Sequence, residues 1–353
     1  MAIGIGIVGS GFMSRTYAFG IHELVEGAQL RAVFGGTRSE AFARDFEIDL
    51  EPSLDRLLAR ADVDVVLLAS PTFLHREQTV AAAATGKHVF TEKPIAASLV
   101  EIDDMIRACR EAGTLLGVNA VTRFRRGIRM AKQLVDRGEI GQIRMVRHTY
   151  AHTLGSFATP DHWILDPRSG SPFVDQGAHC NDAIRWFVGA DATQVFARYE
   201  SYSGTPPPGQ SAMVDFLFGN GVMCQIWASY EFPQPLDPDK WTGDYMFVGS
   251  KGIIDVQYRG TLRIQRGRGW ETLYTHPPVR QPDPDVNFAY PYADQVQDFV
   301  KAIVGGHEPE VTGEDARHGI EMGLAADRSA ATGEIVRLPL RFEAPAPAAD
   351  SRR

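Results

Sequence analysis

Short apolar runs alternate with amphipathic segments from residue 1 to about residue 120. The apolar runs predict β-strands at Ile3–Val8, Leu30–Phe34, Val63–Ala69, His88–Phe90 and Leu115–Val118. After the first run, residues recur at helical spacing at Met13, Tyr17, Gly20 and Leu24. A second helix is predicted over His75–Thr85, ended by Gly86. Strands that alternate with helices indicate right-handed crossovers and a buried parallel sheet, whose ligand-binding loops lie at the carboxyl ends of the strands.

The pattern changes after about residue 140, where strand-like runs follow one another between turn residues. These runs are Ile143–Tyr150, Thr193–Tyr199, Met213–Phe218, Val222–Tyr230, Tyr245–Val248, Ile253–Val256 and Leu262–Ile264. Gly219-Asn220-Gly221 between two of them predicts a hairpin. We therefore expect a mostly antiparallel sheet. A helix that carries Asp175 to Trp186 precedes most of it, and closing helices are predicted at Tyr292–Val304 and Ala316–Ala331.

A chain of 353 residues exceeds one typical hydrophobic core, so two domains are expected. The predicted class is α/β, with a parallel-sheet domain over residues 1–122 and a domain with a large open sheet over residues 123–343. Residues 344–353 form a frayed tail. Aromatic residues on the second set of strands indicate that one sheet face contacts an apolar partner, and we predict another subunit; they are Phe216, Phe218, Trp227 and Tyr230.

Charge and hydropathy argue against several kinds of partner. The formal net charge is −8 and no long basic stripe occurs, so neither nucleic acid nor a membrane surface is the predicted partner. No segment approaches the roughly 20 apolar residues that cross a bilayer. The longest basic cluster is Arg123-Phe124-Arg125-Arg126 with Arg129. It is either a solvated helix start or the edge of a site that contacts a cofactor phosphate or a substrate hydroxyl, and Arg123 is a candidate for the latter.

Three cysteines occur, at Cys109, Cys180 and Cys224, without a Cys-x-x-Cys pair. This argues against disulfide scaffolding and zinc–thiolate sites, and we predict no metal site and a reducing compartment. The apolar N-terminus lacks a charged leader and a cleavage region, so it is predicted to be a strand and not a signal peptide. A cytoplasmic location is the resulting expectation.

Glycines stand where the first predicted strand turns into a helix, in Gly9-Ser10-Gly11-Phe12-Met13-Ser14. Because glycine has no side chain, the backbone there can approach a pyrophosphate, whose negative charge is favoured at the helix N-terminus. The candidate cofactor-binding residues are Gly9, Gly11, Phe12 and Met13. Ser14 replaces the usual third Gly or Ala, a small change that still permits close helix–strand packing. The alternative interpretation of the motif is a tight turn without a ligand.

The end of the second predicted strand bears on the choice between NAD and NADP. NAD-specific sites usually place Asp or Glu there, but this chain has Gly35. No carboxylate repels a ribose phosphate, and Thr37 with Arg38 can hold one. These residues favour NADP, with NAD as the alternative; Arg38 is otherwise an ordinary surface arginine.

Two loops after buried strands carry candidate chemistry. Ser70, Pro71 and His75 follow the third predicted strand and are expected beneath a nicotinamide, although His75 can instead simply begin a helix. Glu92-Lys93-Pro94 follows the next strand, so Glu92 and Lys93 are further candidate cofactor-binding residues. The proline restricts Lys93 to extended conformations. A lysine near a cationic nicotinamide has a lowered pKa and exchanges protons. The alternative for Lys93 is an ion pair with Glu92 or another carboxylate.

Asp175-x-x-x-His179-x-x-Asp182 has spacings of four and three, which place the three side chains on one helix face. Imidazole suits removal of a hydroxyl proton while a hydride leaves the same carbon. Asp175 can orient the imidazole or bind a substrate hydroxyl, and Asp182 can anchor another hydroxyl. The alternative is a solvated polar helix face. The apolar residues that follow this motif argue against that alternative.

These motifs together resemble the Gfo/Idh/MocA oxidoreductases, over nearly the whole chain. The resemblance rests on Gly9-x-Gly11, on the Glu92-Lys93-Pro94 segment and on the Asp175, His179 helix. It implies an N-terminal Rossmann domain, a C-terminal α/β domain and a homodimer or homotetramer built through the open sheet. It also implies a sugar, polyol or sugar-derivative substrate, with Lys93, Asp175 and His179 as the catalytic set.

The resemblance also marks the segment between Ala151 and Pro172 as variable with substrate, so His152, His162 and Trp163 are nominated as substrate-binding residues. The predicted function is an NAD(P)-dependent dehydrogenase of a sugar or polyol hydroxyl carbon. One alternative is a redox-neutral glycosidase or isomerase of the same fold that returns the hydride. Another alternative is a non-catalytic sensor of a sugar or nucleotide. The intact set of Lys, Asp and His argues against a sensor. The sequence does not indicate which sugar or which carbon is oxidised.

Overall fold

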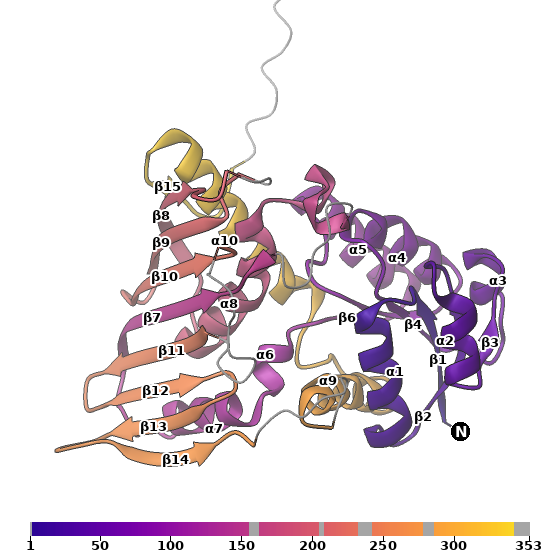
Figure 1. The fold of residues 1–353 in the computed structure, drawn as a ribbon, viewed down its shortest axis with the longest axis horizontal. Helices are drawn as coiled ribbons and strands as arrows, with labels where there is room; N and C mark the ends of the chain where they lie inside the picture. The colour runs from indigo at the N-terminus through magenta and orange to yellow at the C-terminus, as the bar shows by residue number, and fades with distance from the viewer. Residues whose placement is uncertain (1, 155–161, 205–207, 232–241, 278–285, 342–353) are drawn as a thin grey trace, which may run out of the picture.

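The computed structural model describes residues 2–154, 162–204, 208–231, 242–277 and 286–341, and in these the chain forms two sheets (Figure 1). The first sheet has the strand order β3-β2-β1-β4-β5-β6, and every pairing in it is parallel. Its strands are β1 (Ile3–Val8), β2 (Ala28–Phe34), β3 (Asp49–Leu50), β4 (Val65–Leu68), β5 (His88–Thr91) and β6 (Leu116–Val118). The predicted buried parallel sheet is confirmed.

Helices connect these strands as crossovers. They are α1 (Phe12–Leu24), α2 (Ser39–Asp45), α3 (Leu54–Leu58), α4 (His75–Ala84) and α5 (Leu99–Ala112). All four residues of β4 are buried, as expected for a central strand covered on both faces. The carboxyl ends of β1, β2, β4 and β5 therefore share one edge of the sheet, where the candidate loops of the sequence come together.

The second sheet has nine strands in the order β14-β13-β12-β11-β7-β10-β9-β8-β15, and only the β10–β7 pairing is parallel among the described strands. The strands are β7 (Ile143–Ala151), β8 (Ala192–Glu200), β9 (Ser211–Phe218), β10 (Met223–Ser229), β11 (Thr242–Gly249), β12 (Ile253–Gln257), β13 (Thr261–Gln265), β14 (Glu271–Thr275) and β15 (Val336–Arg337). The predicted hairpin at Gly219-Asn220-Gly221 joins β9 to β10 in antiparallel register.

Helices cover one face of this sheet, and Figure 1 shows no helix on the opposite face of the described part. They are α7 (Arg126–Asp136), α8 (Pro172–Val188) and α10 (Gly313–Thr332). Phe216 and Phe218 point towards these helices and belong to the domain's own core. The sequence-based assignment of these two aromatic residues to a contact with another subunit is therefore wrong.

The C-terminal part of the chain returns to the first domain. Helix α6 (Val121–Phe124) follows β6 directly, and α9 (Val286–Gly305) packs against α1. The contact is close, since a Cβ at Gly20 would lie 3.2 Å from Ala293 Cβ. Residues of α9, including Val296 and Phe299, complete the core around β1 and β5.

Two details bear on the sequence predictions. Within the residues described, no helix combines the length and apolar character needed to cross a bilayer. The predicted tail, residues 344–353, lies outside the described part of the chain.

Candidate active site

The glycine-rich turn between β1 and α1 leaves room for a ligand. Gly9 has φ of +109°, and a Cβ there would lie 2.5 Å from Ala69 O, so no other residue fits without rearrangement. A Cβ at Gly11, the N-cap of α1, would meet nothing within 4 Å. The exposed helix N-terminus with open space before it suits a pyrophosphate. Ser14 is fully buried, which fits its predicted role in close helix–strand packing.

The loop after β2 packs directly on this turn. Gly36 has φ of +85°, and a Cβ there would lie 2.3 Å from Ser10 Oγ. The Arg38 backbone N–H donates to the same Ser10 oxygen at 3.1 Å. The side chains of Thr37 and Arg38 are exposed beside the turn. The two predicted cofactor-binding loops are thus neighbours in space.

His75 has a different role from the one predicted. Its side chain is buried, with Nδ1 3.1 Å from Pro94 O and Nε2 2.9 Å from Ser70 O. The ring therefore links the loop after β4 to the loop after β5. Only 1% of the residue is exposed, so the predicted direct contact with a cofactor is contradicted by this position. Ser70 and Pro71 remain partly exposed, although the Ser70 hydroxyl donates to Gln78 Oε1 at 2.6 Å.

Glu92 is also used inside the protein. Its carboxylate is buried and accepts hydrogen bonds from Tyr17 Oη at 2.8 Å, from Asn119 Nδ2 at 2.7 Å and from the Lys93 backbone N–H at 2.9 Å. Burial raises the pKa of Glu92, while these donors oppose the rise. Glu92 therefore holds the backbone of the lysine that follows it, and its contacts do not support the predicted direct cofactor contact.

Lys93 and Asp175 meet although 82 positions separate them in sequence: Lys93 Nζ lies 2.9 Å from Asp175 Oδ1. Tyr230 donates its hydroxyl hydrogen to Asp175 Oδ2. The helix that carries Asp175 begins with Pro172 and is capped by Ser171, whose Oγ accepts from Val174 N–H at 3.0 Å. Asp175 thus stands in the first turn of α8, oriented by a cation and a phenol.

His179 lies one turn further along α8. The residue is half-buried, and its Nδ1 is buried without a hydrogen-bond partner among the described residues. Burial, followed by the charges of Lys93 and Arg125, lowers the pKa of His179 well below its usual range. The ring is therefore neutral at physiological pH and has a free lone pair for a proton.

The nominated residues of the variable segment surround the same place. His152 is buried, with its ring 4.5 Å from that of Tyr150, and burial lowers the pKa of His152 to about 4. Trp163 lines a pocket together with Asp175 and Tyr230. The His162 ring lies next to the Trp163 ring, with the two ring centres 5.4 Å apart. Residues 155–161 of this segment lie outside the described part.

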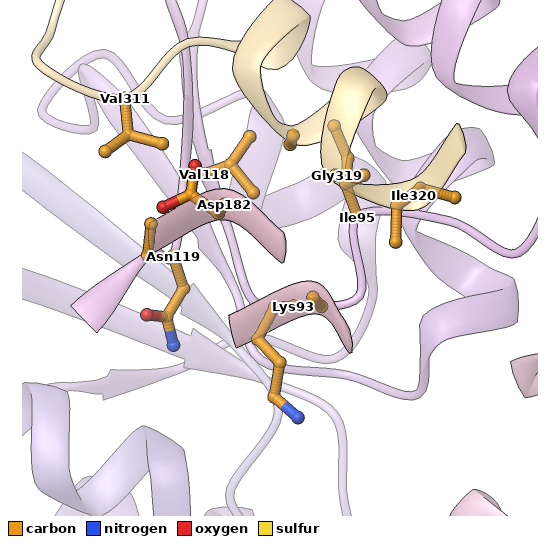
Figure 2. A pocket seen from close by; sticks show the side chains of 11 residues that line it. Lys93, Ile95, Val118, Asn119, Asp182, Val311, Gly319 and Ile320 are labelled. Carbon is orange, nitrogen blue, oxygen red and sulfur yellow. The ribbon is translucent and has the colours of Figure 1, made fainter. Parts of the chain in front are cut away.

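A second cavity lies behind the Lys93 loop (Figure 2). Its walls are largely apolar and include Val118, Val311 and Ile320. Figure 2 shows the Lys93 amine pointing away from the other residues that line this cavity.

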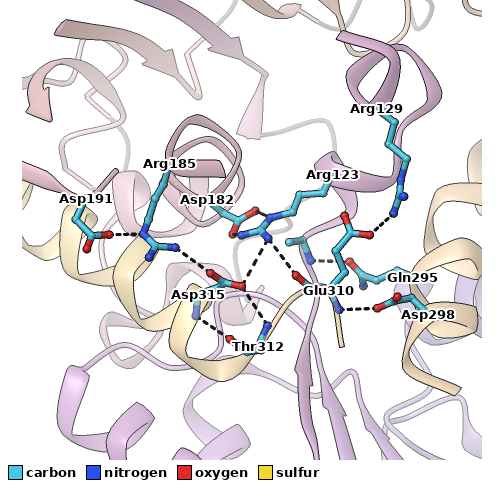
Figure 3. Close-up of polar contacts among 11 residues, drawn as sticks. Arg123, Arg129, Asp182, Arg185, Asp191, Gln295, Asp298, Glu310, Thr312 and Asp315 are labelled. Atoms are coloured by element: carbon cyan, nitrogen blue, oxygen red, sulfur yellow. Dashed lines mark hydrogen bonds and ion pairs between the residues drawn. The ribbon is translucent and has the colours of Figure 1, made fainter. Parts of the chain in front are cut away.

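Arg123 and Asp182 pair with each other at the junction of the two domains (Figure 3). Arg123 Nε donates to Asp182 Oδ2 at 2.8 Å and Nη2 donates to Oδ1 at 2.5 Å, and both side chains are 4% exposed. Arg123 Nη1 also donates to Glu310 O at 3.1 Å. The charges satisfy one another inside the protein, which contradicts the prediction that Arg123 and Asp182 bind substrate hydroxyls.

The pair belongs to a wider network. Arg185 Nη1 donates to Asp315 Oδ1 at 2.8 Å, and Asp315 forms a capping box with Thr312 at the start of α10. Ala120 N–H donates to Gln295 Oε1 at 2.7 Å (Figure 3). Through these contacts the helix α8, the helix α10 and the linker after β6 are fixed to one another.

Sequence reasoning missed Tyr230, Tyr17 and Asn119 as residues that orient the site. Each is a single polar residue near the end of a strand or within a helix, without a motif around it. Their roles depend on partners 27 to 75 positions away, which the chain pattern does not reveal.

The comparisons with known proteins agree with this geometry. Residues 3–120 match the model of an oxidoreductase family with an NAD-binding Rossmann fold, and residues 128–255 match the GFO/IDH/MocA C-terminal domain. A 2,7-anhydro-N-acetylneuraminate hydratase of Escherichia coli is 36% identical over 274 residues, which cover 74% of this chain and 70% of that protein. A 1,5-anhydro-D-fructose reductase of Ensifer adhaerens is 27% identical over 341 residues, 94% of this chain and 98% of that protein.

Among solved structures, an aldose–aldose oxidoreductase from Caulobacter crescentus, in complex with glycerol, superposes with a TM-score of 0.82 at 25% identity. The match covers 96% of this chain and 100% of that one. Two family models, relatives that match along nearly the whole chain and a shared fold all agree. The chain therefore belongs to the Gfo/Idh/MocA oxidoreductases, with an NAD-binding Rossmann domain at its N-terminus.

Proposed function

We propose that this protein is a dehydrogenase that moves a hydride between a hydroxyl-bearing carbon of a sugar, polyol or sugar derivative and a nicotinamide cofactor. The observation that carries the proposal is the pairing of Lys93 Nζ with Asp175 Oδ1 at 2.9 Å beside His179. This cluster lies where the loop after β5 meets α8, at the same sheet edge as the glycine-rich turn. A cation, an orienting carboxylate and a neutral imidazole are the groups that alcohol oxidation needs.

The residues have distinct roles in this proposal. A bound nicotinamide dinucleotide would supply the hydride acceptor, and the helix N-terminus after Gly9 would hold its phosphates. Lys93 donates a hydrogen bond to the substrate oxygen and stabilises the negative charge that develops on it. His179 accepts the hydroxyl proton as the carbon loses its hydride, which leaves a carbonyl product. Asp175 holds the Lys93 amine, and Tyr230 holds Asp175.

A redox-neutral reaction is the second candidate, and one finding favours it. The Escherichia coli relative that is 36% identical over 274 residues is named a hydratase. In such a reaction the hydride would return to the substrate after a transient oxidation. Retained cofactor with no net reduced nicotinamide during turnover distinguishes this candidate from a dehydrogenase.

The test of the function is a screen of sugars and polyols with NAD and NADP in parallel, followed by nicotinamide absorbance and by product chromatography. A dehydrogenase gives equal amounts of reduced cofactor and oxidised sugar. Product without reduced cofactor supports the redox-neutral candidate. If no compound in a broad panel is converted in either assay, the proposal of an enzyme fails.

We propose further that NADP is preferred over NAD. Gly35 leaves the end of β2 without a carboxylate, and Arg38 is exposed beside the turn. A hydrogen bond to a charged group contributes about 1.5–3 kcal/mol, which corresponds to about 10-fold or more in affinity. Arg38→Ala is therefore expected to raise the Kd of NADP at least about 10-fold and to leave that of NAD within about 2-fold.

Calorimetric titration of both cofactors measures this effect. Arg44→Ala is the matched control, because Arg44 is exposed on the same helix and pairs with Asp45 at 3.7 Å. Tighter binding of NAD than of NADP by the unmodified protein would refute the preference.

We also propose that the uncovered face of the second sheet joins two or more copies of the chain. Met223 and Met145 are paired residues on β10 and β7, and they are 53% and 49% exposed. Met213 on β9 is 57% exposed on the same face. Adjacent exposed methionines on an open sheet form an apolar patch that a subunit contact would bury.

The oligomer prediction is tested by the molar mass in light scattering. The unmodified protein is expected as a dimer or tetramer, and Met213→Lys with Met223→Lys is expected to lower the mass towards one chain, because lysine ammonium groups resist burial. Val100→Lys is the control, since Val100 is 64% exposed on α5, away from this sheet. A monomeric unmodified protein contradicts the prediction.

A further inference from the structure

The basic cluster after β6 contains one buried arginine that has no carboxylate partner among the described residues. Arg123 pairs with Asp182, and Arg129 Nη2 donates to Glu310 Oε2 at 2.7 Å. Arg125 is only 9% exposed, its Nε has no hydrogen-bond partner among the described residues, and none of the described carboxylates pairs with its guanidinium. Among the described residues Arg126 also forms no ion pair, but it is exposed, with its Cζ 4.5 Å from the centre of the Tyr290 ring. Arg125 is therefore the buried member of the cluster without a described carboxylate partner.

A buried guanidinium without a counter-ion is energetically unfavourable. Arginine keeps its charge at any physiological pH, so it cannot avoid the cost of burial by losing a proton. Buried charges in proteins are accordingly paired or bound to a ligand. Stacking of Arg125 Cζ over the Tyr258 ring, 5.2 Å from its centre, offsets a part of this cost. The Nε–H of Arg125 is buried and has no acceptor among the described residues, so an oxygen of an anionic ligand would satisfy it.

Arg125 stands in the wall of the candidate active site. The Tyr258 ring on which it stacks lies 5.9 Å from the ring of Tyr150, and Tyr150 lies 6.1 Å from the ring of His179. The positive charge of Arg125 contributes to the lowered pKa of His179, after burial and Lys93. The unpaired guanidinium is thus near the imidazole to which we assign proton transfer.

Asp175 cannot serve as the missing anion. Its Oδ1 accepts from Lys93 at 2.9 Å and its Oδ2 accepts from Tyr230. Lys93 and Arg125 both carry positive charge towards His179, and of these two only Lys93 has a carboxylate partner among the described residues. A ligand that carries a negative charge would neutralise the charge of Arg125.

The cofactor phosphates are an unsuitable source of that charge. The turn at Gly9 and the loop at Gly36 lie at the ends of β1 and β2, whereas Arg125 follows β6. In the sheet order β4 and β5 separate β1 from β6. The anion that Arg125 meets thus belongs to the substrate side of the site.

The geometry points to a substrate that carries an anionic group, a sugar acid or a sugar phosphate, whose oxygens Arg125 binds. The guanidinium fork matches both carboxylate and phosphate oxygens in a bidentate manner. This inference rests on the proposed function, since it names the substrate class of the same site. Arg125 would determine specificity, and Lys93 and His179 would act on a hydroxyl of the same molecule.

Binding, and not turnover, tests the inference. Calorimetry on the full-length protein with saturating cofactor compares matched probes at equal ionic strength: D-glucuronate and D-glucose 6-phosphate against D-glucose, D-galacturonate against D-galactose, and D-gluconate against D-glucitol. At least one anionic probe is expected to bind about 10-fold or more tightly than its neutral partner. Arg125→Met is expected to remove this preference, while the Kd values of neutral sugars and of the cofactor stay within about 3-fold.

Two further variants keep the result interpretable. Arg129→Met removes an arginine of the same cluster that already has a carboxylate partner, and it is expected to change no Kd. Arg125→Lys retains the charge and is expected to keep part of the preference if Arg125→Met does not fold. Comparison of the titrations with D-glucuronate and with D-glucose 6-phosphate shows whether Arg125 binds a carboxylate or a phosphate.

Three results would overturn the inference: no anionic probe binds more tightly than its neutral partner, the preference survives in Arg125→Met, or that variant weakens the cofactor and leaves the sugars unaffected. The last outcome would assign Arg125 to the cofactor. Binding that depends on Arg125 without any hydride transfer would instead refute the proposed dehydrogenase and leave the anion site in place.

Discussion

Replacement of Lys93 by alanine is expected to lower kcat about 10³-fold, within the range of about 10²–10⁴ for loss of a positioned acid–base group. The amine lies 2.9 Å from Asp175 Oδ1 and is the cation proposed to stabilise the developing negative charge. The cofactor phosphates are held elsewhere, so cofactor affinity should change little. Lys301→Ala, at an exposed position of α9, is the control and should retain wild-type kcat.

The pH dependence gives this prediction a second readout. The pKa of His179 is lowered well below its usual range, by burial first and by Lys93 second. A base with a low pKa stays unprotonated, so kcat of the unmodified enzyme should not fall as the pH drops through 6.5. Removing the Lys93 charge raises the pKa of His179 towards its ordinary value. The residual activity of Lys93→Ala should therefore decrease on the acid side, where the imidazole becomes protonated.

Two results would contradict this account of Lys93. Near-wild-type kcat in Lys93→Ala would remove the lysine from the mechanism. An acid limb near pH 6.5 in the unmodified enzyme, unchanged in the variant, would mean that the lysine charge does not act on His179.

Replacement of Arg123 by alanine is expected to lower the free energy of unfolding by about 3–5 kcal/mol, the usual cost of breaking a buried ion pair. Asp182 would remain 4% exposed without its bidentate partner. Urea unfolding measures the change. Arg129→Ala is the control, because the Arg129–Glu310 pair is 39% and 29% exposed and such pairs contribute about 0–1 kcal/mol.

The destabilisation should depend on pH in a defined direction. Burial already raises the pKa of Asp182, and loss of Arg123 removes the main opposing influence. A carboxyl whose pKa is higher in the folded than in the unfolded state stabilises the fold at low pH, and this stability is lost as the pH rises. Arg123→Ala should therefore be least destabilised in acid. A loss of stability below 1 kcal/mol at neutral pH would contradict the assigned structural role.

The strands and the site loops were predictable because their signals are local. Short apolar runs predicted β1, β4 and β5 within a few residues of their observed bounds. Parallel strands bring their carboxyl ends to one edge, so residues 9, 36 and 93 could be expected together. The meeting of Lys93 with the Asp175, His179 helix was a hypothesis about a shared site. The structure places Lys93 Nζ 2.9 Å from Asp175 Oδ1, an ion pair of the kind that the sequence left open as the alternative for Lys93.

Helix α5 (Leu99–Ala112) was missed although its start carries a signal. Ser98 Oγ accepts from Glu101 N–H at 3.3 Å and donates to Glu101 Oε2 at 2.8 Å, which is the Ser-x-x-Glu pattern of a capped N-terminus. The short strands β3 and β15 have two residues each, too few for any apolar period to appear.

The roles of polar residues were predicted less well, because they depend on distant partners. Asp175 and Asp182 share a helix face, but seven residues of helix span about 10 Å, so the second carboxylate reaches the domain junction. There it meets Arg123, 59 positions earlier in the chain. His75 was misassigned for the same reason, since its partners are the backbone carbonyls of Ser70 and Pro94.

The most direct test of the central claim is the rate of hydride transfer in a single turnover, followed by nicotinamide absorbance. It uses a sugar or polyol found in the screen, with the unmodified protein, Lys93→Ala and His179→Ala, each saturated with cofactor. The account predicts rapid reduction of the cofactor in the unmodified protein and a loss of about 10²-fold or more in each variant. Equal rates in all three proteins would show that Lys93 does not stabilise the developing charge and that His179 does not accept the hydroxyl proton.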